Sequence, residues 1–241
     1  MFIHGWCSRQ ADWAPQAAYF SGRHRVLRYD RRGHGASDAP QTGYTPDAHA
    51  RDLGELLDHR GLESVILIAH AGGGPSALAL AGMQPGRVRA VALVEANLYT
   101  AEDQLRRTSP LMEALRQAAT TEIFMQAYRR FLHSRCEAKL ASRVVSDAAS
   151  TPARVIVAEL EGLVVDTFSL ARAITQPVLW IASVPRPGCT DSEGIARAFS
   201  DVRYGQVIGA AHFPQLEVPD QVNAMLAQFV EVELAASSRS S

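Results

Sequence analysis

The chain has little of what marks several classes of protein. Its 241 residues include only 3 cysteines, Cys7, Cys136 and Cys189, whose scattered positions form neither a disulfide framework nor the paired spacing of a zinc site. Its 24 Lys and Arg residues are balanced by 25 Asp and Glu residues, so it lacks the positive excess that nucleic-acid surfaces and polybasic membrane anchors need. We therefore expect no nucleic-acid partner, no membrane partner and no metal site.

Long apolar runs are also missing. The longest, such as residues 65–69 and 91–94, are far shorter than the ~20 residues that cross a bilayer. Residues 1–5 do not begin a charged-then-apolar segment of the kind that opens a secretory signal. These absences predict a cytoplasmic protein, and a hydrophobic content of 47% is enough for a substantial core.

Short β-like runs alternate with helical patterns along the chain, which predicts a mostly parallel sheet with helices on both faces. The strands are expected at residues 24–29, 64–69, 89–95, 177–181 and 203–208. Thr45 and Pro46 form an N-cap and first helical position, so a helix is expected from there to Gly61. Further helices are expected at residues 75–83 and 219–232.

From about residue 97 to residue 173 the pattern contains helices only. Apolar residues recur at helical spacing over 111–132, and Thr151-Pro152 precedes a second such pattern. A helical block between two strands of a parallel sheet suggests a lid over the sheet edge. The predicted division is an α/β core at residues 1–96 and 174–241 and a helical cap at residues 97–173.

The segment Ala69-His70-Ala71-Gly72-Gly73 lies between a predicted strand and a predicted helix. A nucleophile elbow places its serine on a strained turn at this position, and small flanking residues let the strand and the helix approach each other. Here the nucleophile position holds Ala71, whose methyl group cannot attack a carbonyl. On this segment alone, a packed strand–turn–helix junction is the alternative interpretation.

Two further loops are candidates for chemistry. His4-Gly5-Trp6 ends a short apolar run, where backbone N–H groups could face a reacting carbonyl; a plain strand-to-loop turn is the alternative. His212 follows the last predicted strand, at the sheet edge where open α/β sheets carry their chemistry. For a single histidine, a solvent-facing loop position is the commoner explanation.

Together with residues 30–37 (Asp-Arg-Arg-Gly-His-Gly-Ala-Ser), these segments resemble the α/β-hydrolase superfamily, in its small cap-bearing esterase, lactonase and C–C hydrolase branch. The resemblance covers nearly the whole chain, with four motifs in the family's order. It implies that the N–H groups of Trp6 and Gly72 form the oxyanion hole, that Ala71 occupies the nucleophile position and that His212 is the base. It implies structural roles for three other residues: Asp30, Ser37 and His70.

The resemblance leaves two positions for the triad acid. Most members carry Asp a few residues after the strand predicted at 177–181, but residues 183–188 hold no carboxylate and Asp191 is the nearest candidate. Other members take the acid from the end of the strand after the elbow, where Glu95 stands. A carboxylate that closes a buried strand needs a partner, and a histidine N–H is a suitable one, so we favour Glu95 over Asp191. A salt bridge to a cap arginine such as Arg106 or Arg107 is the alternative role for Glu95.

The start of the chain departs from the family's pattern. The strand that leads into His4-Gly5-Trp6 should lie inside the sheet, between residues 26–29 and 65–69, yet only residues 1–3 are present to form it. The two strands that normally precede it are absent. We expect the polypeptide to begin upstream of Met1.

The resemblance implies hydrolysis of an ester, lactone or related carbonyl bond in a small, fairly apolar molecule, by a monomer or homodimer without metal or organic cofactor. Ala71 should prevent covalent acyl transfer. The alanine at position 71 has three possible origins. It is an engineered replacement of serine, it belongs to a natural enzyme whose chemistry needs no covalent intermediate, or it belongs to a relative of the family that binds a small molecule without reaction. The competing functions are a cofactor-free lyase or oxygenase-type enzyme that uses His212 as base, and a small-molecule binding protein.

Overall fold

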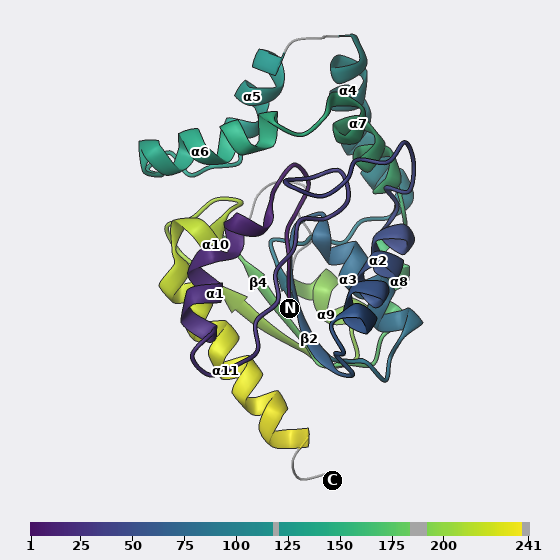
Figure 1. The fold of residues 1–241 in the computed structure, drawn as a ribbon, viewed down its shortest axis with the longest axis vertical. Helices are drawn as coiled ribbons and strands as arrows, with labels where there is room; N and C mark the ends of the chain where they lie inside the picture. The colour runs from purple at the N-terminus through teal and green to yellow at the C-terminus, as the bar shows by residue number, and fades with distance from the viewer. Residues whose placement is uncertain (118–120, 184–191, 238–241) are drawn as a thin grey trace.

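The computed structural model of the chain describes residues 1–117, 121–183 and 192–237 (Figure 1). Its centre is a parallel sheet with the strand order β1-β2-β3-β4-β5. The strands are β1 (Phe2–Ile3), β2 (Val65–His70), β3 (Val88–Val94), β4 (Val178–Ala182) and β5 (Val202–Gln206). The three central strands are nearly continuous runs of apolar residues because helices cover both faces of the sheet.

The segment at residues 24–29 is not a strand, which corrects the sequence-based expectation. It lies beside β1 as expected, but it pairs there only through an isolated bridge between Phe2 and Arg28, supported by a hydrogen bond of 2.8 Å from the Phe2 N–H to the Leu27 carbonyl. Because β1 offers only two residues as partners, a longer ladder cannot form. The other four predicted strands are confirmed to within a few residues at each end.

Helices pack on both faces of the sheet (Figure 1). One face carries α2 (Pro46–His59), α3 (Gly73–Met83), α8 (Thr167–Arg172) and α9 (Ser192–Ala198). The other carries α1 (Ala14–Phe20) and α11 (Pro219–Ser237), with the short η1 (Gln10–Trp13) and α10 (Pro214–Glu217) beside them. The predicted start of α2 is confirmed, because the Thr45 hydroxyl accepts a hydrogen bond of 3.3 Å from the Ala48 N–H.

The core consists of two apolar layers, one on each face of the sheet. Successive residues of a strand point to opposite faces, so Leu67 packs in the layer under α2 and α3 and Ile68 packs in the layer under α11. Leu93 and Val94 divide between the two layers in the same way. Each such fully buried side chain contributes roughly 1.5–3 kcal/mol to folding. This packing gives the ends of the strands a rigid base.

Four further helices lie between β3 and α8, above the sheet in Figure 1: α4 (Ala101–Gln117), α5 (Thr121–Arg129), α6 (Ala138–Ala149) and α7 (Ala153–Gly162). The apolar pattern at residues 111–132 therefore belongs to two helices, α4 and α5. A third apolar cluster, which includes Tyr128 and Ile156, packs these helices onto Cys7 and Phe213 from the loops after β1 and β5.

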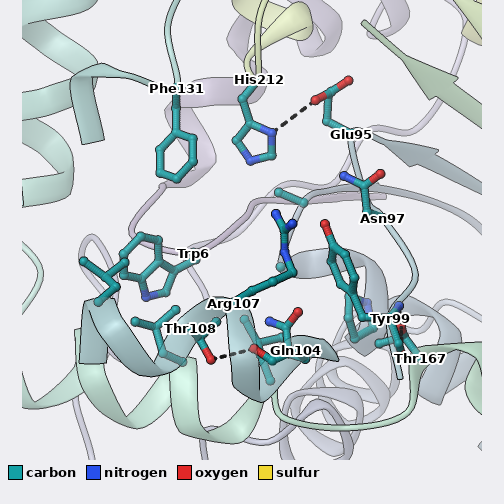
Figure 2. A pocket seen from close by; sticks show the side chains of 16 residues that line it. Trp6, Glu95, Asn97, Tyr99, Gln104, Arg107, Thr108, Phe131, Thr167 and His212 are labelled. Atoms are coloured by element: carbon teal, nitrogen blue, oxygen red, sulfur yellow. Dashed lines mark hydrogen bonds and ion pairs between the residues drawn. The ribbon is translucent and has the colours of Figure 1, made fainter. Parts of the chain in front are cut away.

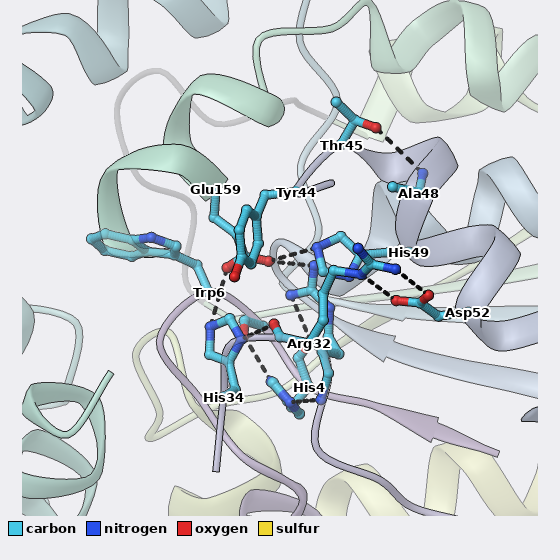
Figure 3. Close-up of polar contacts among 12 residues, drawn as sticks. His4, Trp6, Arg32, His34, Tyr44, Thr45, Ala48, His49, Asp52 and Glu159 are labelled. Atoms are coloured by element: carbon cyan, nitrogen blue, oxygen red, sulfur yellow. Dashed lines mark hydrogen bonds and ion pairs between the residues drawn. The ribbon is translucent and has the colours of Figure 1, made fainter. Parts of the chain in front are cut away.

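A buried ion pair also attaches α7 to the sheet side of the molecule (Figure 3). The Glu159 carboxylate lies 2.5 Å from the Arg31 guanidinium, 3.2 Å from His34 Nε2 and 3.1 Å from His49 Nε2, and all four side chains are at most 2% exposed. Burial alone would raise the pKa of Glu159, but Arg31 and the two histidines hold it well below its usual value. Glu159 is therefore an ionised anchor between the helical segment and the loops that carry the site.

Candidate active site

A cavity of about 320 Å³ lies at the carboxyl end of the central strands, between the sheet and the helical segment (Figure 2). Loops after β1, β2, β3 and β5 line it from one side, and α4 and α7 line it from the other. The structure brings five of the residues predicted for the site to this cavity: Trp6, Ala71, Gly72, Glu95 and His212. The alternative acid, Asp191, lies outside the described residues.

Ala71 stands on a sharp turn between β2 and α3. Its φ of 45° lies in the left-handed region, where a residue with a Cβ is strained by roughly 1–2 kcal/mol. The turn is held by a hydrogen bond of 3.0 Å from the Ala71 N–H to the Val94 carbonyl. A Cβ on Gly73 would stand 2.6 Å from the His4 carbonyl oxygen, so only glycine permits this close approach. A positive φ between a strand and a helix is the backbone geometry that a nucleophile elbow requires, and Ala71 carries no hydroxyl.

Two backbone donors lie beside Ala71. A Cβ built on Gly72 would stand 3.2 Å from the Trp6 nitrogen, so these two residues are close neighbours at the cavity wall. Neither the Trp6 N–H nor the Gly72 N–H donates a hydrogen bond within the part of the chain that the structure describes. Trp6 is fixed by its indole N–H, which donates to the Ile156 carbonyl at 3.0 Å. Two free donors next to the elbow are what a developing oxyanion requires.

His212 and Glu95 form a hydrogen-bonded pair beside the elbow (Figure 2). His212 Nδ1 lies 3.2 Å from Glu95 Oε2, and the other carboxylate oxygen accepts from the Ser183 N–H at 2.6 Å and from the Ser183 hydroxyl at 2.7 Å. Burial would raise the pKa of Glu95, but the hydrogen bonds from His212 and Ser183 lower it to about 2. Glu95 is therefore ionised at neutral pH and oriented towards His212.

The ring of His212 is held from several sides. Its backbone N–H donates to the Phe131 carbonyl at 2.9 Å, and its own carbonyl accepts a hydrogen bond of 2.6 Å from His70 Nε2. The Phe131 ring lies 5.1 Å away, centroid to centroid. Since Nδ1 faces Glu95, Nε2 is the nitrogen left for the cavity, and it forms no hydrogen bond with any described residue.

Sequence reasoning did not place the side chains of α4 at the cavity, although it named Arg107 as a possible partner of Glu95. They are Gln104, Arg107, Thr108 and Leu111, which follow the i, i+3, i+4, i+7 spacing of one helical face. That spacing was visible in the sequence. However, it mixes polar and apolar residues, so a search for apolar stripes passes over it. Asn97 and Tyr99, which follow β3, complete this wall.

Two other kinds of site were sought among the residues that the structure describes. No cluster of three or more His, Cys, Asp or Glu side chains there is arranged to hold a metal ion. No helix of the described ranges has both the length and the apolar character needed to cross a bilayer.

Comparisons with known proteins identify the family and the fold of the chain. A profile described as the alpha/beta hydrolase fold matches residues 1–219. A non-heme chloroperoxidase of Streptomyces lividans is 42% identical over 98 residues, which are 40% of this chain and 36% of that protein. The chain thus matches only about a third of the length of that relative.

Longer matches are more distant in sequence. The protein named 3-oxoadipate enol-lactonase 1 of Acinetobacter baylyi is 25% identical over 226 residues, covering 91% of this chain and 83% of that protein. The crystal structure of an enol-lactonase from Burkholderia xenovorans superposes with a TM-score of 0.84 at 24% identity, covering 95% of this chain and 90% of that one. The structural likeness is evidence for the fold.

Proposed function

Because the chain belongs to the alpha/beta hydrolase fold family, we propose that its cavity is a site for hydrolysis of an ester, lactone or related carbonyl bond in a small molecule, disabled in its covalent step by Ala71. The observation that carries the proposal is the hydrogen bond between His212 and Glu95 beside a strained elbow with two free N–H donors. The long match to an enol-lactonase favours the same class of substrate.

The proposed mechanism needs one oxygen atom more than the chain has. With serine at position 71, His212 Nε2 would take the hydroxyl proton while the serine oxygen attacks the substrate carbonyl. The N–H groups of Trp6 and Gly72 would hold the oxyanion, and Glu95 would stabilise the protonated ring of His212. The ring would then return the proton to the leaving oxygen, and water would release the acyl group by the same steps in reverse. Apart from the substrate and this water, the proposed steps use groups of the protein.

With Ala71, the site would still bind its substrate. The N–H donors, the base and the cavity wall do not depend on the missing hydroxyl. We infer that residues 97–173 act as a cap, since α4 and α7 close the cavity opposite the strand ends and shield a bound molecule from water. The chain would then hold an ester or lactone without forming an acyl intermediate.

One observation favours a second function, a cofactor-free lyase or oxygenase-type reaction. The His212–Glu95 pair is complete although the nucleophile is absent, and the low pKa of Glu95 keeps the carboxylate ionised at its partner ring. Such a pair can take an acidic proton from a bound molecule whose carbonyl is held by the oxyanion donors. This reaction would need no group at position 71.

The Ala71→Ser substitution separates the two functions. Hydrolysis of p-nitrophenyl acetate and of a small lactone should appear with Ala71→Ser and be absent from the unchanged chain. His212→Gln added to Ala71→Ser is the matched control and should remove the new activity. If Ala71→Ser folds but hydrolyses neither compound, the hydrolase proposal is wrong. A substrate consumed by the unchanged chain, but not by His212→Gln, would then support the second function.

A further inference from the structure

The cavity has one polar wall, formed by Asn97, Gln104 and Arg107 (Figure 2). Asn97 follows the end of β3, and the other two lie one turn apart on α4. The side-chain amides of Asn97 and Gln104 form no hydrogen bond with any residue in the described ranges. Apolar side chains, among them Trp6 and Phe131, line other parts of the cavity.

The neighbouring threonine hydroxyl groups, in contrast, do form hydrogen bonds within the protein. The Thr108 hydroxyl donates to the Gln104 carbonyl at 2.9 Å, and the Thr167 hydroxyl donates to the Tyr99 carbonyl at 3.1 Å. Their hydrogen-bonding capacity is used to hold the local backbone. The side-chain amides of Asn97 and Gln104 thus have hydrogen-bonding capacity left for a ligand.

Arg107 brings a positive charge to the same wall. Its guanidinium carbon lies 4.7 Å from the centre of the Tyr99 ring, and in Figure 2 the group extends from α4 into the cavity. Stacking of this kind uses the face of the guanidinium group, while its N–H donors radiate from the edge. Those donors match the two oxygens of a carboxylate. The adjacent Arg106 does not line the cavity and pairs with Asp103 on its own helix.

We propose that the polar wall binds a carboxylate group of the substrate, with Arg107 supplying the charge and Asn97 and Gln104 supplying amide donors. The substrate is then a small anionic ester or lactone rather than a neutral apolar one. The inference rests on the proposed function for the place of the reacting carbonyl at Trp6 and Gly72. Carboxylate binding itself needs no turnover, and the volume of about 320 Å³ limits the molecule to a small one.

The test uses pairs of compounds that differ in charge but not in shape. The probes are the monomethyl esters of succinate, glutarate, adipate and pimelate, each paired with the methyl ester whose free carboxylate is replaced by a carboxamide. Because the unchanged chain with Ala71 should not hydrolyse them, their dissociation constants can be measured by calorimetry or ligand-observed NMR. We expect at least one acid to bind about tenfold more tightly than its amide, as a single charged hydrogen-bonding contact predicts.

Three variants assign the preference to Arg107. Arg107→Gln should remove the preference for the acid, and Arg107→Lys should retain part of it because the charge remains. Arg106→Gln is the matched control, since it removes the same charge from the same helix outside the cavity, and it should bind like the unchanged chain. Since Arg107 is exposed at the cavity mouth, the preference should also weaken between about 0.05 and 0.5 M NaCl.

Each outcome bears on one proposal only. If no acid of the series binds better than its amide, or if Arg107→Gln and Arg106→Gln reduce the preference equally, the carboxylate site is wrong. Turnover by Ala71→Ser would leave the hydrolase proposal standing in that case. If the acids bind preferentially through Arg107 while Ala71→Ser hydrolyses no ester of the series, the carboxylate site stands and the hydrolase proposal fails.

Discussion

His70 Nε2 donates a hydrogen bond of 2.6 Å to the backbone carbonyl of His212, which lies 142 residues further along the chain. His70 is the last residue of β2 and directly precedes the turn at Ala71, so this bond ties that turn to the loop that carries His212. The two rings also lie 4.9 Å apart, centroid to centroid. The position of His212 Nε2 relative to Ala71 therefore depends on a residue that does not line the 320 Å³ cavity.

The first prediction concerns this bond. His70→Leu leaves the His212 carbonyl without its donor and should lower the free energy of unfolding by roughly 1–3 kcal/mol. Added to Ala71→Ser, it should lower kcat more than it changes KM, because the base is displaced while the substrate contacts remain. Urea denaturation and steady-state kinetics measure the two effects. His59→Leu, on the exposed end of α2, should change neither.

The second prediction concerns the acid. Glu95→Gln added to Ala71→Ser should keep the fold and lose most of the turnover, because an amide cannot stabilise a protonated His212. The corresponding change in serine proteases costs about 10⁴-fold. Asp191→Asn is the comparison and should have little effect. Near-normal kcat in Glu95→Gln together with a large loss in Asp191→Asn would move the acid to position 191.

The third prediction concerns the anchor of α7. Glu159→Gln should lower the free energy of unfolding by roughly 3–5 kcal/mol, because it leaves the buried Arg31 charge without its partner. Glu161→Gln on the same helix removes an exposed ion pair with Arg116 and should cost at most about 0.5 kcal/mol. Thermal and urea unfolding compare the two. Equal effects of the two substitutions would show that the buried pair does not anchor the helix.

The fourth prediction concerns pH. Burial and the neighbouring Arg31 lower the pKa of His49 from 6.5 to about 4. Between these values the unfolded chain binds a proton at His49 that the folded chain does not, so the free energy of unfolding should fall as the pH is lowered, by about 3 kcal/mol over the window. His49→Gln should reduce the slope of the unfolding free energy against pH by the amount that corresponds to the uptake of about one proton on unfolding. Some slope should persist, because burial also holds the pKa of His4 well below its usual value.

Glu95 acts in a more acidic window with the same sign. Its pKa of about 2 lies below its usual 4.5, so its contribution is fully present above pH 4.5 and is lost as the pH falls towards 2. Urea denaturation midpoints at several pH values distinguish the two groups. A stability that stays constant between pH 6.5 and 4 would contradict the lowered pKa of His49.

The fifth prediction concerns the strained elbow. Ala71→Gly should raise the free energy of unfolding by about 1 kcal/mol, because glycine adopts a positive φ without the clash of a Cβ. A matched substitution at an ordinary φ, Ala79→Gly within α3, should lower it by a similar amount or more. Calorimetry detects both. Destabilisation by both substitutions would mean that the turn at position 71 stores no strain.

Sequence patterns located those parts of the fold that local chemistry determines. Thr45 and Pro46 marked the start of α2, and β-branched runs marked β2 and β4. The segment at 24–29 has the composition of a strand but lacks a partner of sufficient length, and composition does not report what lies beside a segment. The short α1 and η1 carry no long apolar stripe, so periodicity did not find them.

The candidate site was also predictable only in part. The motif residues at the strand ends were found because their spacing along the chain is recognisable. The polar wall was not, since it depends on which face of α4 turns towards the sheet and on how far the helical segment stands from it. Both depend on how the elements pack against one another, which the pattern of a single sequence does not specify.

The turn at Ala71 keeps a left-handed backbone that alanine itself does not favour. Were the turn used only to connect a strand to a helix, relaxation or replacement by glycine would lower the energy of the folded chain. The turn thus already has the backbone geometry that the proposed mechanism needs, although the alanine side chain cannot perform its covalent step. A single nucleotide change from an alanine codon to a serine codon would supply the missing oxygen without moving the backbone. The chain therefore lies one mutational step from the triad that we propose.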